Sequence, residues 1–295
     1  MCTLTLDVAL QQAIVDDAYD DLLSDFLAWA QAQESVRAAI QVGSRARGSP
    51  PADQWSDLDL ILFVDEPARF LDDTRWIEEI SPVWIVLPSR TARNDPELLV
   101  MFEGGYNVDF VICPAEGLRR APRRADPGSA FVRGARILID RDGRAAKHVP
   151  EAFGSPVRKP PTKDEFIRVC DAFWYAAVYV ARQIARGELW LAKVRDGDVK
   201  QLLLTMLEWH AGTHGSWQTD TWHMGRHIEE WADPHVLGQV RLTFGGYDAE
   251  PAAEALVATI RLFQWTAQDT SDRLGYHLPR ATEARCMRLI LEALP

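Results

Sequence analysis

The first half of the chain alternates between short apolar runs of strand length and stretches whose apolar residues recur at helical spacing. The strand-like runs, most of them bounded by Gly or Pro, lie at 36–42, 58–64, 83–87, 98–102, 106–113 and 135–139. Helical spacing occurs at 7–33 and 72–80. This pattern predicts an α/β half that is built on a mixed, strongly bent sheet with flanking helices.

Strand signals end after residues 153–161, a segment rich in Gly, Pro, Lys and Arg that we interpret as a linker. Beyond it, apolar residues follow the helical period over 164–186, 198–210, 253–268 and 279–294. The second half is therefore predicted to be an α-helical bundle. The whole chain is predicted to be an α+β protein with two domains, residues 1–154 and 155–295.

The charge of the chain narrows the class of partner. Its 295 residues carry a net charge of −11. Polyanions are bound through clusters of Lys and Arg, so the acidic balance makes a nucleic-acid partner unlikely and favours a cationic one.

The spacing of the cysteines, the N-terminal residues and the length of the apolar runs bear on the cellular compartment of the protein. Cys2, Cys113, Cys170 and Cys286 are far apart and form no metal-finger spacing, which is typical of free thiols in a reducing compartment. The N-terminus has no basic region of the signal-peptide kind, and no apolar run approaches the ~20 residues of a membrane span. We expect a cytoplasmic protein, monomeric or homodimeric, without a membrane partner.

The stretch 40–64 combines a buried-looking strand, a Gly-Ser turn and two acids inside the next strand. Asp57 and Asp59 alternate with leucine, so their side chains share one face, about 7 Å apart. Two carboxylates on one face repel each other unless a cation lies between them. Gly43 ends the first strand, and Ser44 is expected to cap a short helix whose free N–H groups suit a phosphate.

A third acid, Asp109, lies on a strand otherwise made for burial, after the hairpin turn Glu103-Gly104-Gly105. Three carboxylates on neighbouring strands suit divalent metal, normally Mg²⁺, and two-metal phosphoryl transfer. Each element alone has a simpler interpretation: Asp-x-Asp also occurs at solvated strand ends, and Asp109 can be a hydrogen-bonded core acid. Their combination favours a metal and triphosphate site.

Gly43-Ser44, Asp57-x-Asp59 and Asp109 resemble the core of the polymerase-β type nucleotidyltransferases. Further segments resemble the aminoglycoside 6-adenylyltransferases (streptomycin adenylyltransferases), and the similarity extends from about residue 20 to 275. These segments are Phe102-Glu103-Gly104-Gly105 with Val108-Asp109-Phe110, Phe173-Trp174 with Tyr179-Val180-Ala181, Arg186-Gly187-Glu188-Leu189-Trp190 with Ala192-Lys193, Met206-Leu207-Glu208-Trp209-His210, and Gly225-Arg226.

The resemblance implies a nucleotidyltransferase domain at 1–154 and a helical domain at 155–295 that binds substrate or nucleotide. It implies ATP as co-substrate, with its triphosphate bound at Gly43, Ser44 and Arg45. Mg²⁺ would be held by the catalytic residues Asp57, Asp59 and Asp109. Asp109 would ligate metal, accept the proton of the attacking hydroxyl, or do both.

Two basic residues of the helical half are candidates for binding the triphosphate. Lys193 follows an aromatic helix turn, although it is equally typical of a solvated surface lysine. Arg226 follows Gly225 where the family tends to have Gly-Lys, and Arg also binds phosphate.

The implied acceptor is a hydroxyl of a polycationic aminoglycoside, whose guanidinium groups favour carboxylates. Candidate substrate-binding acids are Glu103, Asp171, Glu188 and Glu208, each of which also fits a solvated surface. The aromatic residues of the second half are more typical of a helical core than of a stacking platform.

Four histidines, His210, His214, His223 and His227, form two pairs at i, i+4 spacing. Because glycines interrupt or flank these pairs, and because Mg²⁺ does not need imidazole, we expect no zinc site there.

The leading interpretation is an enzyme that transfers AMP from Mg-ATP to an aminoglycoside hydroxyl and releases pyrophosphate. One alternative keeps the chemistry but acts on another small hydroxylated metabolite or on a protein. A second alternative is a nucleotide-binding module that has lost catalysis.

Overall fold

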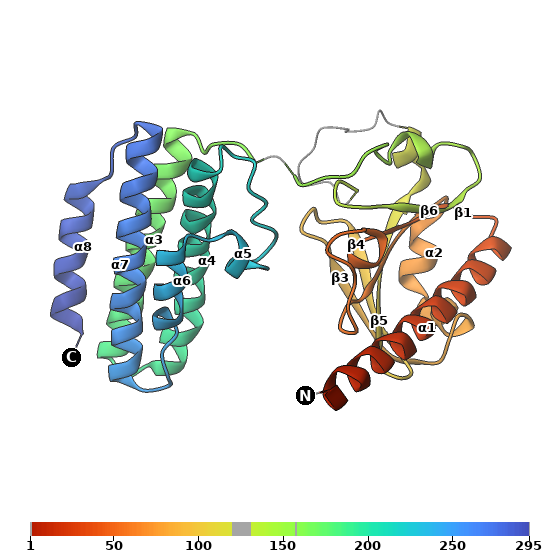
Figure 1. The fold of residues 1–295 in the computed structure, drawn as a ribbon, viewed down its shortest axis with the longest axis horizontal. Coiled ribbons are helices and arrows are strands. Elements are labelled where there is room, and N and C mark those ends of the chain that lie inside the picture. Colours follow the sequence, from red (N-terminus) through yellow and green to blue (C-terminus); the bar gives the residue numbers. More distant parts are fainter. Residues whose placement is uncertain (1, 120–130, 157, 295) are drawn as a thin grey trace. The chain divides into compact units, whose positions relative to one another are not determined.

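The computed structural model describes residues 2–119, 131–156 and 158–294, and divides into two compact units, Met1–Pro156 and Val157–Pro295. The first unit contains a six-stranded sheet with helices, and the second is helical (Figure 1). The α+β class with a mixed sheet is therefore confirmed. Within the described ranges, no helix combines the length and the apolar character needed to cross a membrane.

The sheet of the first unit has the order β3-β4-β5-β2-β1-β6. Its β2–β5 pair is parallel and the other neighbouring pairs are antiparallel. The strands are β1 (Val36–Val42), β2 (Leu58–Val64), β3 (Val83–Arg90), β4 (Pro96–Phe102), β5 (Tyr106–Pro114) and β6 (Arg136–Asp140).

The two faces of this sheet have different roles. Alternate residues of β2 and β5, such as Leu60 and Phe110, are buried in the main core of the unit against the long helix α1 (Cys2–Ala32), together with α2 (Pro67–Asp72). The intervening residues point to the opposite face, where Ile61 belongs to a smaller cluster. Asp59 and Asp109 follow this second alternation, so the sheet presents its acids on the face away from α1.

Two expectations for the first unit are wrong in detail. Residues 72–80 do not form one helix: α2 ends at Asp72, and a 3-10 helix follows at Thr74–Glu79 because the Asp73 side chain accepts a hydrogen bond from Arg75 N. Strand β3 does not end before Pro88 but continues to Arg90. Proline is tolerated there because β3 is an edge strand, which need not donate a ladder hydrogen bond at that position.

Helices α3, α4 and α7 pack together to form the second unit (Figure 1). Phe173 of α3 stacks on Phe263 of α7, with ring centroids 3.6 Å apart, in the centre of this core. The helices are α3 (Lys163–Ala185), α4 (Leu189–His214), α5 (Ile228–Trp231), α6 (Pro234–Val240), α7 (Ala249–Leu274) and α8 (Arg280–Ala293).

Helix α4 differs from the expectation at both ends. It begins at Leu189 rather than at residue 198, and it continues through Gly212 to His214. The expectation that glycine interrupts the His210–His214 spacing is therefore wrong. The short helices α5 and α6 were not predicted, since neither is long enough to display a helical period.

Candidate active site

Strand pairing brings together two acids that lie far apart in the sequence. In the parallel β2–β5 ladder, Asp59 is the register partner of Asp109, and Asp57 precedes β2 directly. Carboxylate oxygens of all three residues lie within 4.8 Å of one another. Sequence reasoning predicted these three residues as a group, and the structure places them in one cluster.

Gly43 closes one side of this cluster. Its φ of +75° lies in the left-handed region that favours glycine, and a Cβ built at this position would lie 1.8 Å from Asp59 Oδ2. Backbone therefore approaches the carboxylate more closely than any side chain would permit.

Ser44 begins a 3-10 helix, Ser44–Ala46, whose N-cap is Gly43. The expectation that Ser44 caps this helix is therefore wrong. Its Oγ is instead buried, with no hydrogen-bond partner among the residues that the structure describes. This hydroxyl follows Gly43, whose backbone closely approaches Asp59, and it is a donor that a phosphate oxygen would satisfy.

Arg45 is held by groups that sequence reasoning missed. Its Nε donates to the Ser56 carbonyl at 3.1 Å, and its guanidinium lies 3.7 Å from the centroid of the Tyr19 ring. The Tyr19 hydroxyl accepts a hydrogen bond from Asn107 N on β5. Tyr19 belongs to the apolar stripe of α1, so no feature of the sequence distinguishes it from an ordinary core residue.

The charged form of Asp109 is disfavoured by its surroundings. Burial, together with the charges of Asp57 and Glu97, raises the pKa of Asp109 to about 6. Glu97 is a fourth acid that we did not predict, and burial raises its pKa as well. It lies on β4 two residues before Leu99, the register partner of Asp109, so strand alternation places it on the same face.

The donor set fits Mg²⁺. Three converging carboxylates supply the hard oxygen ligands that this ion prefers. Burial and the charges of Asp57 and Glu97 raise the pKa of Asp109, which indicates that nearby positive charge would stabilise its ionised form. A divalent cation would supply that charge.

The other predicted residues have varied surroundings. In the first unit, Glu103 is exposed in the β4–β5 turn; in the second, Asp171, Glu188 and Arg226 are exposed. Glu208 is mostly buried, and its carboxylate accepts a hydrogen bond from Arg158 Nη1 at 3.0 Å.

Lys193 lines a cavity of about 590 Å³ in the second unit, together with Lys200, Met224, Gly225 and Phe244. Its Nζ donates to the Gly245 carbonyl at 2.9 Å. The cavity places Lys193 near Gly225, the neighbour of Arg226, so two segments that we predicted separately are close together in the fold.

Known proteins resemble this chain over most of its length. A family model described as streptomycin adenylyltransferase matches residues 18–291. An aminoglycoside 6-adenylyltransferase of Bacillus subtilis is 23% identical, with 88% of this chain and 92% of the relative covered. One from Campylobacter jejuni is 21% identical, with 89% and 90% covered.

Among solved structures, an aminoglycoside 6-adenyltransferase from Bacillus subtilis aligns with a TM-score of 0.43 at 19% identity, covering 91% of this chain and 95% of that one. The family model spans far more than half of the sequence and includes all three acids of the cluster. The chain therefore belongs to the streptomycin adenylyltransferase family and is a nucleotidyltransferase.

Proposed function

We propose that this protein transfers AMP from Mg-ATP to a hydroxyl group of a streptomycin-like aminoglycoside and releases pyrophosphate. The observation that carries the proposal is the convergence of Asp57, Asp59 and Asp109 beside the Gly43 turn. Residues 1–154 are assigned to the nucleotidyltransferase domain and residues 155–295 to the domain that binds substrate and nucleotide. A cytoplasmic location, where ATP is available, is part of the proposal.

The Gly43–Ser44 turn binds the triphosphate of ATP in this proposal. The Ser44 hydroxyl donates to a phosphate oxygen and so gains the partner that it lacks within the protein. Arg45, held in place by Ser56 and Tyr19, adds positive charge at the same turn. Lys193 and Arg226 are assigned to the triphosphate from the helical domain, as the family resemblance implies.

Asp57, Asp59 and Asp109 would hold Mg²⁺, and the bound ion would supply positive charge that stabilises the phosphates during attack. The oxygen of the acceptor hydroxyl forms a bond to the α-phosphorus, and the bond from that phosphorus to the bridging oxygen of pyrophosphate breaks. The Asp109 carboxylate takes the hydroxyl proton. In the metal-free protein, burial and the charges of Asp57 and Glu97 raise the pKa of Asp109 to about 6, which indicates a higher affinity for a proton than that of an ordinary carboxylate.

The acceptor is recognised through its positive charges. Streptomycin carries guanidinium groups, which pair with carboxylates in two parallel hydrogen bonds. Glu103, Asp171 and Glu188 are exposed and accessible to such groups. Glu208 already pairs with Arg158, so a substrate guanidinium would have to replace that arginine to bind there.

The test is mass spectrometry of streptomycin after incubation with the protein and Mg-ATP. The expected product is streptomycin with one added AMP, together with one pyrophosphate per product. If a broad panel of aminoglycosides gives neither, the acceptor assignment is wrong.

Matched substitutions separate the acid cluster from general charge effects. Asp57→Asn is expected to reduce turnover by at least about 100-fold, since it removes a ligand whose charge is needed in the transition state. Asp65→Asn, at the other end of β2 and exposed, is expected to retain activity. Equal losses in both variants would contradict the role given to the cluster.

A further inference from the structure

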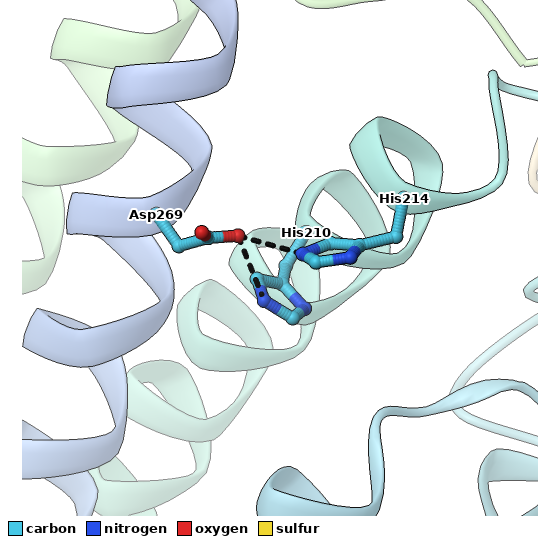
Figure 2. Close-up of side chains that lie close together, drawn as sticks. All are labelled: His210, His214 and Asp269. Carbon is cyan, nitrogen blue, oxygen red and sulfur yellow. Dashed lines mark hydrogen bonds and ion pairs between the residues drawn. The ribbon is translucent and has the colours of Figure 1, made fainter.

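A second convergence of metal-binding side chains lies inside the helical unit. His210 and His214 are one turn apart near the end of α4, and both imidazoles face Asp269 of α7 (Figure 2). The Nε2 atom of His214 is 2.7 Å from Asp269 Oδ2, and the Nε2 atom of His210 is 3.2 Å from the same oxygen. One ligand atom from each residue lies within 4.8 Å of the other two.

The environment of His210 makes this group unusual. The side chain is 1% exposed, and its Nε2 satisfies no hydrogen-bond geometry, although Asp269 Oδ2 is near. A buried polar nitrogen without a partner is costly. A metal ion bound to this nitrogen would give it the partner that it lacks among the described residues.

We propose that His210, His214 and Asp269 bind a divalent transition-metal ion of the Zn²⁺ type. Two imidazole nitrogens at i, i+4 on one helix and a carboxylate from a second element form an established donor set for this ion. Imidazole suits Zn²⁺, Co²⁺ and Ni²⁺, whereas Mg²⁺ prefers oxygen ligands alone. This site is therefore chemically distinct from the cluster of Asp57, Asp59 and Asp109.

The distances are close to those that a metal requires. With metal–ligand bonds of about 2.0–2.1 Å and tetrahedral angles, neighbouring ligand atoms lie about 3.3 Å apart. The His210–Asp269 pair already has this spacing, and the His214–Asp269 pair must open by about 0.6 Å. His214 can make this movement because its side chain is 40% exposed.

Arg273 competes for the same carboxylate. Its Nε donates to Asp269 Oδ2 at 2.9 Å, so its positive charge lies near the proposed ion. The arginine side chain is 43% exposed, which lets solvent screen that charge and lets the guanidinium move to the second carboxylate oxygen. Outer-sphere donors of this kind commonly orient metal-bound carboxylates.

A bound ion would connect the last turn of α4 to α7. The partial exposure of His214 and Asp269 provides an entry path and leaves a fourth position for water. The alternative is a purely hydrogen-bonded group, in which Asp269 accepts from His214 and Arg273 and His210 stays unsatisfied. The proposed metal site would bind added Zn²⁺ or Co²⁺, whereas the purely hydrogen-bonded group would not.

The test is titration of the full-length protein with Co²⁺ in saturating Mg²⁺, followed by visible absorption. Nitrogen-ligated tetrahedral Co²⁺ absorbs much more strongly than Co²⁺ in an oxygen-ligated octahedral site. We expect one equivalent to bind with this absorption, and we expect Zn²⁺ to displace it and to raise the Tm. Absence of the absorption in the wild-type protein would overturn the proposal.

Variants identify the ligands. His214→Gln and Asp269→Asn are expected to weaken Co²⁺ binding at least tenfold and to abolish the Zn²⁺-dependent rise in Tm. Two variants serve as controls: Asp57→Asn alters the cluster of three acids in the first unit, and His223→Gln alters an exposed histidine outside the proposed site. Both are expected to bind Co²⁺ as the wild-type protein does. Since His214 is half-exposed, its variant should fold, as circular dichroism would verify. A folded His214→Gln protein with unchanged Co²⁺ binding would refute the site.

Discussion

At the scale of single residues, the acid cluster depends on Gly43 as much as on the carboxylates. A methyl group at Gly43 has no space, because Asp59 Oδ2 occupies its position. Gly143 also has a positive φ, +65°, but a Cβ there meets nothing within 4 Å. Comparing alanine substitutions at Gly43 and Gly143 therefore separates the effect of the close contact with Asp59 from the effect of the left-handed backbone conformation.

Gly43→Ala is expected to reduce kcat by at least about 100-fold, because the displaced Asp59 no longer holds metal in the productive geometry. Gly143→Ala is expected to retain activity and to lower the free energy of unfolding by about 1 kcal/mol. Steady-state kinetics and urea denaturation measure the two effects. A Gly43→Ala enzyme with near-normal kcat would show that the close approach is not needed.

Asp109 leads to a prediction about pH and stability. Its pKa in the fold, about 6, is above the ordinary carboxyl value of 3.8, so the folded protein binds a proton that the unfolded chain releases. Metal-free stability is therefore expected to fall as pH rises from about 4 to about 6, and to stay lower above that range.

The Asp109→Asn substitution is expected to remove this loss of stability at higher pH, because an amide does not ionise. Without metal, the variant is expected to be more stable than the wild-type protein at pH 7.5 by on the order of 1 kcal/mol, allowing for partial solvent screening. The difference should vanish at pH 4 and shrink when Mg²⁺ is added. Urea denaturation at the two pH values provides the measurement, and a variant that is less stable at pH 7.5 would contradict it.

At the scale of elements, the sequence predicts best where a period is long and uninterrupted. Strands β1 and β2 match the expected ranges, because each apolar run ends at a turn or a charge. The sequence did not predict the start of α4 at Leu189, because Asp196-Gly197-Asp198 is typical of a helix boundary. In the fold, Lys200 pairs with Asp196 across this segment at 2.7 Å, and the buried Ala192 anchors the preceding turn in the core.

The candidate site was only partly predictable for a related reason. Asp59 and Asp109 interrupt apolar strands and Asp57 directly precedes one, and acids in such positions are visible in a sequence. Tyr19 and Glu97 reach the site only through tertiary contacts, since a tyrosine on an amphipathic helix and an acid near a strand end are ordinary by themselves. The order of the strands in the sheet places β5 next to β2, and no local sequence pattern predicts that order.

The N-terminus of α3 carries a prediction at this scale. Thr162 Oγ1 accepts from Glu165 N at 3.3 Å, and the Glu165 carboxylate accepts from Thr162 N at 2.7 Å, which forms a capping box. Thr162→Ala is expected to lower the free energy of unfolding by about 1 kcal/mol. Thr205→Ala, within α4, serves as control and is expected to change it by less than about 0.5 kcal/mol. Thermal and urea denaturation distinguish the two, and equal effects would refute the capping role.

At the scale of the whole molecule, the net charge of −11 bears on substrate capture. An excess of negative charge attracts a polycationic antibiotic from a distance, and added salt screens that attraction.

We expect the KM for streptomycin to rise several-fold between about 20 mM and about 300 mM NaCl, with a much smaller change in kcat. A neutral osmolyte at matched osmolarity is the control. A KM that is independent of salt would show that recognition of the acceptor does not depend on the charge of the protein.

The parallel pairing of β2 with β5 also determines when the acid cluster can form during folding. Two further strands, β3 and β4, are synthesised between Asp59 and Asp109, and the acids become neighbours only when β5 closes against β2. Contacts between residues this far apart in the sequence form slowly, because the chain must lose the entropy of closing a long loop before the contacts stabilise it. A nascent or half-folded chain therefore has not yet brought Asp59 next to Asp109. In the function that we propose, such a chain would lack the metal site, so activity would appear only after β5 has paired with β2.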